Sequence, residues 1–458
     1  MSPKFGTSGL RGLVTELTPD CVTRHVTAFV AACPVGAGLF IGHDLRPSSP
    51  DIAMYVAHAA RAAGVDVVMC GPIPTPALAL AAMSDGAAAV MVTGSHIPAD
   101  RNGLKFYTPT GEITKADETA ILAVRDQSRN VTPGDMALRD DVGAAYCERY
   151  TAAFQGALGG MRVGLYAHSA VGRDDLRRLL TALGAEVTVL GWSDAFVPVD
   201  TEAVSPAVRQ QLRDWAETHD FAAIVSTDGD GDRPLMTDET GEVIPGDILG
   251  QITAMVLGAD TVVTPVSSNT GADSQFATVI RTKIGSPYVI AGMQTQTGRV
   301  AGYEANGGFL LGYTAHGPSG TLAPLMTRDA VLPLIAGLVA GRDRGLAHVV
   351  AEQPARFTAA DRIADVSRQA VENMLLRLKD DAAYRAALLK QLGAREANVD
   401  LTDGLRITCV DGRIIHFRAS GNAPELRVYT EAKSVSAARD TTLDSIACIL
   451  DILGQTHA

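Results

Sequence analysis

Short apolar runs alternate with amphipathic segments over the first part of the chain. The run at residues 39–41 has the apolar character of a buried strand, and residues 51–63 show the apolar spacing of a helix. The same reasoning predicts a strand at 65–70, a helix at 75–83 and a strand at 87–92. This βαβαβ order predicts a parallel sheet that is covered by helices.

The alternation of strands and helices begins again twice further along the chain. After a polar stretch at 127–141, the pattern predicts strands at 162–166, 186–190 and 221–225 and helices at 174–183 and 208–218. A third set of apolar runs predicts strands at 261–264, 288–290 and 309–311. Three successive α/β units indicate an internal structural repeat, although no strong repeat of residues accompanies it.

The C-terminal part of the chain follows a different pattern. Helical periodicities run over 361–377 and 381–392, and Asp411-Gly412 is a two-residue hairpin signal. Strands are predicted at 405–410, 413–417 and 426–431, followed by a closing helix at 436–453. This predicts an α+β module. A chain of 458 residues is also too long for one ordinary core, so three or four domains are expected.

The most distinctive polar motif is Asp228-Gly-Asp230-Gly-Asp232, which follows the apolar run at 221–225. Alternate side chains of an extended backbone project to one side, and the two glycines allow a tight bend close to a ligand. Three carboxylates that converge in a cleft repel one another unless a cation lies between them. An all-oxygen set suits a hard cation, so the motif predicts a Mg²⁺ site for phosphate chemistry.

Two other interpretations of this motif stay open. An EF-hand loop begins D-x-D-x-D, and Glu239 stands at its twelfth position, but Arg233 stands at the sixth position, where that loop needs glycine. A solvated acidic turn is common, but the chain becomes apolar again soon after Arg233. The flanking segments also have the pattern of strands rather than helices, which favours the metal site over the EF-hand.

A second motif, Thr93-Gly-Ser95-His96, follows the predicted strand at 87–92, and Lys105 lies a few residues further on. A serine at the carboxyl end of a strand in an open α/β sheet is well placed to meet a ligand. His96 could position or exchange a proton, and Lys105 could stabilise phosphate charge. Taken alone, the motif is also compatible with a Ser/His turn that has no chemical role.

Three further segments carry clustered polar residues. The segment at 418–427 joins two predicted strands and offers two arginines, a hydroxyl, an amide and a glycine turn, which suit a phosphate dianion. The segment at 302–308 places Glu304 and Asn306 on a glycine-rich loop, where they can bind vicinal sugar hydroxyls. The N-terminal segment carries Arg11, which could close over an anion. Each segment alone is also compatible with an ordinary polar loop or a mobile start.

In this order, the motifs resemble those of the α-D-phosphohexomutase superfamily, in particular its bacterial phosphomannomutase/phosphoglucomutase branch. The resemblance covers essentially the whole chain: G-T-S-G-x-R-G, the serine loop, D-G-D-G-D-R, the sugar loop and the terminal R-x-S-G-N loop. It implies an α/β fold with three similar mixed-sheet α/β domains and a C-terminal α+β domain around a central cleft. The expected domains are 1–145 with a phosphoserine loop, 146–250 with a metal loop, 251–355 with a sugar-binding loop and 356–458 with a phosphate-binding loop.

The resemblance also implies a role for each matching residue. Ser95 matches the phosphorylated serine, and its phosphate oxygen joins three aspartates as Mg²⁺ ligands: Asp228, Asp230 and Asp232. The residues expected around the reacting phosphate are Arg11, His96, Lys105 and Arg233. Those expected to line the sugar are Glu304 and Asn306, at O3 and O4, with Lys283 as a further cleft residue. The clamp for the phosphate that is not reacting is expected to comprise Arg418, Ser420, Gly421, Asn422 and Arg427.

Two motifs depart from the usual pattern of the family. The serine loop has T-G-S-H-I-P in place of T-A-S-H-N-P, so it loses an amide and is expected to have a more flexible backbone. The sugar loop has Y-E-A-N-G-G in place of G-E-x-S-G-H, which puts Asn306 where relatives have serine and Gly308 where they have histidine. Because that histidine is a candidate for proton transfer in relatives, the sequence leaves the general acid/base undetermined.

The resemblance implies reversible phosphoryl transfer between hexose 1-phosphate and hexose 6-phosphate, with mannose or glucose as the sugar. Phosphorylated Ser95, Mg²⁺ and a hexose 1,6-bisphosphate as activator and intermediate belong to this mechanism. The alternatives are a phosphoglucosamine mutase, a noncatalytic sugar-phosphate sensor and a Mg²⁺ phosphatase. A sensor needs neither Ser95 nor the three aspartates, and a phosphatase would release inorganic phosphate that a mutase conserves.

Composition narrows the partners and the compartment. The chain has 39 basic and 51 acidic residues and a net charge of −12, which disfavours broad binding to nucleic acid or anionic membranes. Six scattered cysteines without a C-x-x-C pair predict reduced thiols. The N-terminus lacks the apolar core of a signal peptide, and no run approaches the length of a membrane span. We therefore expect a cytoplasmic monomer or homodimer that binds a small-molecule sugar phosphate.

Overall fold

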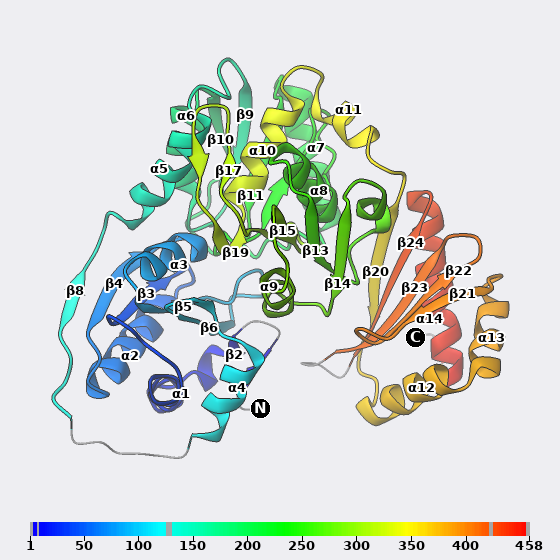
Figure 1. The fold of residues 1–458 in the computed structure, drawn as a ribbon, viewed down its shortest axis with the longest axis horizontal. Helices are drawn as coiled ribbons and strands as arrows, with labels where there is room; N and C mark the ends of the chain where they lie inside the picture. Colours follow the sequence, from blue (N-terminus) through cyan, green and yellow to red (C-terminus); the bar gives the residue numbers. More distant parts are fainter. Residues whose placement is uncertain (1–2, 7–8, 125–130, 421–424, 455–458) are drawn as a thin grey trace.

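The computed structural model describes residues 3–6, 9–124, 131–420 and 425–454. In these ranges the strands form four large sheets and one small two-stranded sheet. Figure 1 shows the first sheet at the left in blue, the second and third at the top centre in green, and the last at the right in orange. The sheets thus follow one another in chain order, as expected for a chain of several domains.

The first sheet carries helices on both faces. Its order is β1-β2-β6-β5-β3-β4-β8, with β7 paired to β6. The strands are β1 (Lys4–Phe5), β2 (Leu10–Leu13), β3 (Leu39–His43), β4 (Val67–Pro72), β5 (Ala88–Val92), β6 (Arg101–Thr108), β7 (Gly111–Glu112) and β8 (Met136–Leu138). The helices are α1 (Pro19–Ala32), α2 (Ser49–Ala62), α3 (Thr75–Ser84) and α4 (Lys115–Ala123), with a short 3₁₀ turn at Val14–Glu16. Successive strand residues face opposite sides, so Ile41 packs with α1 and α2 while Phe40 packs with α3.

The second and third sheets have the orders β10-β9-β11-β12 and β14-β13-β15-β16-β19. The second comprises α5 (Val142–Phe154), β9 (Arg162–Tyr166), α6 (Arg173–Ala182), β10 (Glu186–Leu190), α7 (Pro206–Thr218), β11 (Ala223–Thr227) and β12 (Pro234–Met236). The third comprises α8 (Gly246–Val256), β13 (Thr261–Pro265), a 3₁₀ turn (Thr270–Ser274), β14 (Thr278–Thr282), α9 (Ser286–Gln294), β15 (Val300–Tyr303), β16 (Phe309–Leu311), β19 (Leu325–Asp329), α10 (Val331–Gly341) and α11 (Leu346–Ala351). The small sheet pairs β17 (Ala315–His316) with β18 (Thr321–Leu322).

A common topology confirms the predicted internal repeat. The strand orders β4-β3-β5-β6, β10-β9-β11-β12 and β14-β13-β15-β16 share two parallel pairs followed by one antiparallel pair. The predicted serine, metal and sugar loops all join the third strand of their unit to the fourth. The antiparallel fourth strand makes each sheet mixed, so the purely parallel sheet inferred from the βαβαβ pattern is wrong, and the mixed sheets implied by the resemblance are confirmed.

The last domain is an antiparallel sheet with helices, which confirms the predicted α+β module. Its strand order is β20-β24-β23-β22-β21. Its elements are β20 (Phe357–Ile363), α12 (Arg368–Asp380), α13 (Ala382–Gln391), β21 (Glu396–Asp400), β22 (Leu405–Cys409), β23 (Ile414–Ala419), β24 (Leu426–Ala432) and α14 (Val435–Leu453). The loop between β23 and β24 is the predicted phosphate clamp.

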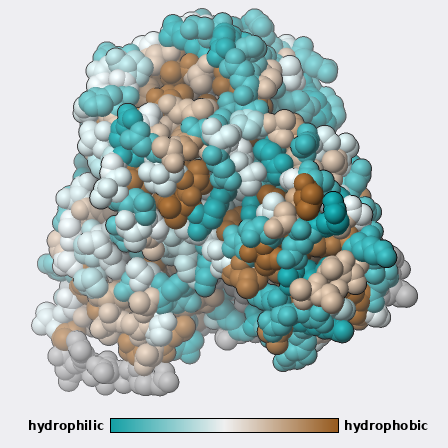
Figure 2. Space-filling view, turned by 45° about the vertical axis from the view of Figure 1, so that its right-hand side comes forward, coloured by the Kyte–Doolittle hydropathy of each residue, from teal (hydrophilic) through white to brown (hydrophobic). Residues whose placement is uncertain are grey.

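The packing of apolar side chains separates the last domain from the rest. One large buried cluster runs through the first three sheets and includes Phe40, Val163 and Leu249. The last domain has its own cluster, which includes Leu378 and Phe417. The space-filling view shows the lower part of the molecule divided into two lobes with a notch between them (Figure 2). A domain that buries its core by itself can change its position without unpacking its neighbours.

Two predicted elements differ from the structure. Residues 288–290 were expected as a strand, but they lie in α9, where Pro287 occupies the first turn and suits a helix start. The predicted helix at 361–377 begins too early, because 357–363 pairs along its length with β24 and the helix starts after Ser367, whose side chain caps it. In both cases tertiary pairing and end signals override the local apolar pattern.

The proposed domain limits at 145/146 and 250/251 fall inside α5 and α8, which are continuous helices. We propose the same four domains, with each of these two limits placed just before the helix that it would otherwise divide. Across the described residues, no helix is both long enough and apolar enough to cross a membrane.

Candidate active site

Ser95 lies just beyond the carboxyl end of β5 and points at the metal loop of the second sheet. Its Oγ donates a hydrogen bond to Asp228 Oδ2 at 2.5 Å, and its N–H donates to Thr93 Oγ1 at 2.8 Å. Ser95 has a φ of 54°, in the left-handed region that residues with side chains rarely adopt. Such a conformation persists only where the surroundings fix it, so the loop holds the hydroxyl in one place.

A buried arginine holds the loop that carries Ser95. Arg46 pairs with Asp44 and donates hydrogen bonds of 2.5–2.9 Å to four loop carbonyl oxygens, those of Ser95, Ile97, Pro98 and Arg101. A Cβ on Gly94 would lie 2.6 Å from the Arg46 guanidinium carbon. Glycine in T-G-S-H therefore makes room for this guanidinium, whose hydrogen bonds to the loop oppose the gain in flexibility expected from glycine.

Asp228, Asp230 and Asp232 converge in the loop between β11 and β12, and all three are fully buried. One carboxylate oxygen of each lies within 4.8 Å of the others. Asp230 Oδ2 accepts from Thr75 Oγ1 at 2.5 Å and from Lys105 Nζ at 2.6 Å, and Asp232 Oδ2 accepts from Lys105 Nζ at 2.5 Å. Asp230 Oδ1 and Asp232 Oδ1 are buried without a hydrogen-bond partner in the described part of the chain. These orphaned hard oxygens, beside Asp228 and Ser95, fit a Mg²⁺ ion.

The three carboxyl groups differ in how strongly they favour ionisation. Burial, reinforced by Asp230 and Asp232, raises the pKa of Asp228 well above its ordinary value. Burial acts on Asp232 as well, but Arg328, Lys105 and Arg233 outweigh it and hold the pKa of Asp232 far below its usual range. Burial and Asp232 also oppose ionisation of Asp230, yet Lys105 and Thr75 lower its pKa on balance. A bound cation would favour the ionised form of all three.

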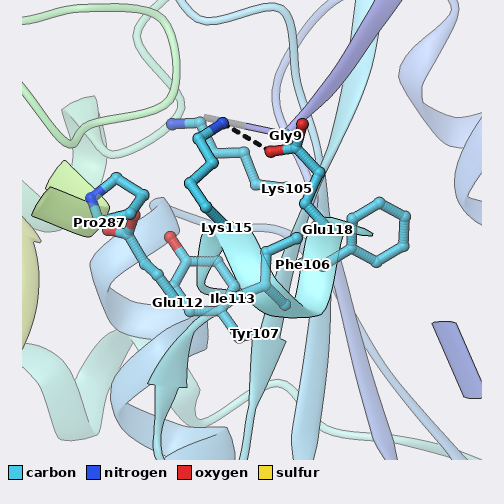
Figure 3. Close-up of a pocket in the computed structure, with 9 residues that line it drawn as sticks. All are labelled: Gly9, Lys105, Phe106, Tyr107, Glu112, Ile113, Lys115, Glu118 and Pro287. Atoms are coloured by element: carbon cyan, nitrogen blue, oxygen red, sulfur yellow. Dashed lines mark hydrogen bonds and ion pairs between the residues drawn. The ribbon is translucent and has the colours of Figure 1, made fainter. Parts of the chain in front are cut away.

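Two basic residues of the first sheet approach the same loop. Lys105 on β6 is buried and binds two of the aspartates, and its stem lines a small pocket with Lys115 and Pro287 (Figure 3). Arg11 on β2 pairs in register with Gly103 of β6. Burial, with Arg233 and Arg328 nearby, lowers the pKa of Arg11 to about 10, so the side chain remains a cation at neutral pH.

His96 contacts the metal loop through a guanidinium. Arg233 Nη1 donates to His96 Nδ1 at 2.8 Å, and the Ser95 Oγ lies 3.4 Å from the same nitrogen. Burial and the adjacent Arg233 lower the pKa of His96 to about 3. The imidazole therefore accepts a hydrogen bond as a neutral ring, which suits it to position Arg233 rather than to take up a proton.

The sugar loop between β15 and β16 lies beside the metal loop. Glu304 and Asn306 are buried, with exposed fractions of 4% and 6%. Glu304 Oε2 accepts a hydrogen bond from Arg328 Nη1 at 3.1 Å, and the same guanidinium binds Asp232. Asn306 Oδ1 accepts from the Gly308 N–H at 3.0 Å, which shapes the loop from within.

The formal charges of this site balance when a bound cation favours ionisation of Asp228, whose pKa is otherwise raised. Four carboxylates, Asp228, Asp230, Asp232 and Glu304, face four cations, Arg11, Lys105, Arg233 and Arg328. A phosphate group carries a charge of roughly −1.5 to −2 near neutral pH. A divalent cation and a phosphate can therefore enter together without leaving a large uncompensated charge in a buried site.

The predicted phosphate clamp in the last domain is built on adjacent strands. Arg418 on β23 stands opposite Arg427 on β24 in register. Arg418 Nε donates to Asp403 Oδ2 at 2.9 Å, and Arg427 Nε donates to Glu425 Oε1 at 3.0 Å. Ser420 is buried and adjoins this pair. Gly421 and Asn422 lie outside the described residues.

The predicted clamp and the metal loop share an electrostatic neighbour, Glu202. The carboxylate of Glu202 lies within electrostatic range of both Arg233 and Arg427. Lys283 is exposed on the loop after β14, and the neighbouring Ile284 N–H donates to Asp403 Oδ2 at 3.0 Å. Apart from Lys283, every described candidate residue thus lies in the metal site, the sugar loop or the predicted clamp.

Sequence reasoning missed three residues that organise the site: Arg46, Thr75 and Arg328. Thr75 begins α3 and binds Asp230 through both its hydroxyl and its N–H, at 2.5 and 2.9 Å. Indirect signals for the two arginines were present, since each packs against a glycine that departs from the family pattern: Arg46 against Gly94 and Arg328 against Gly308.

Comparison with known proteins supports this arrangement. Models of the phosphoglucomutase/phosphomannomutase family match residues 2–131 (alpha/beta/alpha domain I), 245–357 (alpha/beta/alpha domain III) and 359–444 (C-terminal domain). The chain belongs to this family. It is therefore a phosphohexomutase, an isomerase that transfers a phosphoryl group within a hexose phosphate.

Individual relatives agree over nearly the full length. A phosphomannomutase of Sinorhizobium fredii is 43% identical and covers 98% of this chain and 99% of its own. A phosphomannomutase of Salmonella muenchen is 44% identical over 94% of this chain and 92% of its own. Curated phosphoglucosamine mutases are more distant, at 26–29% identity. A family protein of Burkholderia thailandensis has the same fold, with a TM-score of 0.78 at 21% identity over 99% and 98% of the two chains.

Proposed function

We propose that this phosphohexomutase interconverts the 1-phosphate and 6-phosphate of mannose, and of glucose as a second substrate, through a phosphorylated Ser95. The observation that carries the proposal is the 2.5 Å hydrogen bond from Ser95 Oγ to Asp228, which places a fixed hydroxyl at the edge of a carboxylate triad. The two relatives above 40% identity are phosphomannomutases, which favours mannose. The two arginines of the predicted clamp suit the second phosphate.

In the first half-reaction, the bond between phosphorus and Ser95 Oγ breaks and a bond forms to the free hydroxyl of the sugar. Ser95 keeps the electron pair of the broken bond and ends as a hydroxyl, and the sugar hydroxyl loses its proton. The product is a hexose 1,6-bisphosphate. Catalysis of such a transfer consists mainly of positioning and charge stabilisation.

In the second half-reaction, the bisphosphate reverses its orientation in the cleft and returns its other phosphoryl group to Ser95. Each phosphate must then be bound once at the triad and once at the clamp of Arg418, Ser420, Gly421, Asn422 and Arg427. Contacts in the middle of the ring have to serve both orientations. Glu304 and Asn306 are assigned to O3 and O4 because these hydroxyls lie in the middle of the ring, away from both phosphate-bearing carbons.

Asp228, Asp230, Asp232 and an oxygen on Ser95 would hold a Mg²⁺ ion. When bound, that ion would offset negative charge on the transferring phosphoryl group. Arg233, positioned by His96, would bind the phosphoryl oxygens, and Lys105 and Arg11 would add positive charge from the first sheet. Lys283 would meet the substrate at the entrance of the cleft, beside Asp403.

The six cysteines are all free, which supports the proposed cytoplasmic setting.

The test is incubation with mannose 1-phosphate, Mg²⁺ and a trace of glucose 1,6-bisphosphate, followed by identification of the product. The proposal predicts mannose 6-phosphate without release of inorganic phosphate. Free phosphate would indicate a phosphatase, and binding without turnover would indicate a sensor. Parallel kcat/KM values for mannose, glucose and glucosamine phosphates rank the sugars, and a preference for glucosamine would overturn the mannose assignment.

A further inference from the structure

Arg328 connects the metal loop to the sugar loop. It lies on β19, next to last in the strand, and its exposed fraction is 2%. Its Nε and Nη2 donate to Asp232 Oδ2 at 3.1 and 2.8 Å, and its Nη1 donates to Glu304 Oε2 at 3.1 Å. One planar guanidinium thus binds a carboxylate from the second sheet and a carboxylate from the third.

In each of these carboxylates, one oxygen accepts hydrogen bonds from Arg328 and the other does not contact Arg328. Asp232 Oδ1 is buried, has no hydrogen-bond partner among the described residues and lies 3.7 Å from Arg233 Nε. No described residue donates a hydrogen bond to Glu304 Oε1. The arginine therefore fixes both carboxylates while leaving one oxygen of each for the metal and for the sugar.

Glycine at position 308 makes room for this arginine. A Cβ on Gly308 would lie 2.9 Å from Arg328 Cδ and 3.0 Å from its Cγ. The stem runs between the backbone of β19 and a guanidinium that Asp232 and Glu304 hold in place, which limits its freedom to move away. A larger side chain at 308 and the observed Arg328 conformation therefore exclude one another.

The residues on either side of Arg328 anchor β19. Thr327 Oγ1 donates to Glu112 Oε1 at 3.1 Å, a contact to the first sheet. Asp329 Oδ1 accepts from the Tyr146 hydroxyl at 2.6 Å, and Asp329 Oδ2 accepts from the Tyr150 hydroxyl. Arg328 thus projects from a strand that is tied to the first sheet and to helix α5, as a positioning group requires.

We propose that Arg328 is a positioning residue that locks the metal loop to the sugar loop, so that a phosphate at the metal and the sugar ring at Glu304 are held in one register. The inference rests on the proposed function, since it assigns the metal and sugar contacts to Asp232 and Glu304. It predicts a coupling: metal at the triad strengthens binding of the sugar bisphosphate, and Arg328 carries part of that effect.

The bridge that Arg328 forms between Asp232 and Glu304 depends on the shape of the guanidinium as well as on its charge. Arginine presents several donors in a rigid planar fork, whereas the lysine ammonium is a compact point charge on a flexible stem. A lysine at 328 would keep the positive charge but bind only one of the two carboxylates well. Arg328→Lys therefore separates the bridge from simple charge compensation.

The test uses glucose 1,6-bisphosphate as the probe, in a Ser95→Ala background that prevents turnover. Calorimetry gives its dissociation constant with and without Mg²⁺, and the ratio of the two constants measures the coupling. The proposal predicts that Arg328→Met and Arg328→Lys each weaken bisphosphate binding in Mg²⁺ by about 10-fold to 100-fold, as expected for a lost charged hydrogen bond. Both should also lower the coupling ratio.

A double-mutant cycle with Glu304→Gln identifies the partner. If Arg328 acts through Glu304, Arg328→Lys adds little to Glu304→Gln, and the two effects fail to sum. Arg385→Met is the matched control, since Arg385 is a buried arginine paired with Glu396 in the last domain, outside the active site. It should leave the coupling ratio unchanged.

The outcomes separate the two proposals. If Glu304→Gln weakens binding and Arg328→Lys does not, the bridge is overturned while the proposed function stands. If Glu304→Gln binds as tightly as the parent, the sugar contact is wrong and the inference about Arg328 falls, whereas phosphoryl transfer through Ser95 is decided by product identification. Should Arg328→Met fail to fold, as judged by thermal unfolding, Arg328→Lys alone still decides, because it keeps the charge that Asp232 and Glu304 require.

Discussion

The Ser95 hydroxyl donates a 2.5 Å hydrogen bond to Asp228 across the boundary between the first and second sheets. The two residues are 133 positions apart in sequence, yet each lies in the loop between the third and fourth strands of its own repeat unit. The sugar loop has the same position in the third unit. The site is therefore formed where equivalent edges of three similar sheets meet.

The first prediction concerns the metal. Chelation of divalent ions should reduce turnover by at least about 100-fold, because a bound cation supplies several kcal/mol of charge stabilisation. Mg²⁺ should restore it. Asp230→Asn should weaken Mn²⁺ binding, measured by electron paramagnetic resonance, whereas Asp260→Asn, at an exposed ion pair, should not. Full activity in the presence of excess chelator would contradict the metal assignment.

The second prediction concerns Gly246, the first residue of α8. A Cβ there would meet Gly307 N at 2.4 Å and the Ala305 carbonyl oxygen at 2.5 Å, so Gly246→Ala must displace the sugar loop. A displacement of about 1 Å can cost on the order of 100-fold in rate, and we expect kcat/KM to fall at least about 10-fold. Gly159→Ala is the matched control, since its nearest contact is 3.4 Å away. Equal kinetics for both variants would show that the loop tolerates the shift.

The third prediction concerns pH and Asp247, which follows Gly246. Burial raises the pKa of Asp247 to about 6, so the folded state holds the proton more tightly than the unfolded chain, whose pKa is near 4. The stability that this group contributes is present below about pH 4 and is lost as the pH rises through about 6. Relative to wild type, Asp247→Asn should gain about 3 kcal/mol in unfolding free energy between pH 4 and pH 7.5.

Urea unfolding of both proteins across that pH range measures the difference. The substitution also changes one hydrogen bond, because the two carboxylate oxygens of Asp247 accept from the Ile248 and Asn269 N–H groups. The test of the raised pKa is therefore how the difference in unfolding free energy varies with pH, and not its absolute value. Asp140→Asn, at an exposed aspartate, serves as the control. A difference between wild type and Asp247→Asn that does not change with pH would rule out the raised pKa.

The fourth prediction concerns movement of the last domain. This domain has its own apolar core, and Asp403 links it to the third sheet by accepting from the Ile284 N–H while binding Arg418. We expect small-angle scattering to show a smaller radius of gyration when glucose 1,6-bisphosphate is added. Asp403→Ala should raise KM by about 10-fold, because the clamp arginine loses its charged partner. An unchanged radius and unchanged KM would argue for a rigid cleft.

Local sequence was enough to locate the loops to which we assign the chemistry. The metal motif and the serine motif each follow a short apolar strand, so their position at a sheet edge could be inferred without knowing the fold. The clamp was equally visible, because Arg418 and Arg427 flank one hairpin loop. In each case the residues of the motif are neighbours in sequence, although their contacts to other loops, such as that of Ser95 with Asp228, span long separations.

The residues that sequence reasoning missed act over long separations. Arg328 binds carboxylates 24 and 96 positions away, and Arg46 binds carbonyl groups about 50 positions away. No local pattern encodes such contacts. The strand wrongly predicted at 288–290 has a related cause, since Tyr288 and its neighbours suit a strand by composition but follow a proline-led helix start.

The most direct test of the account is to follow one phosphoryl group onto Ser95 and off again. Protein incubated with glucose 1,6-bisphosphate should gain a single phosphoryl group by intact mass, and peptide mapping should place it on Ser95. Addition of mannose 1-phosphate should then remove it in one turnover and yield mannose 1,6-bisphosphate. Ser95→Ala should neither acquire the group nor turn over, while Ser436→Ala should behave as wild type. Mutase activity that persists in Ser95→Ala, or a phosphoryl group on another residue, would contradict the account.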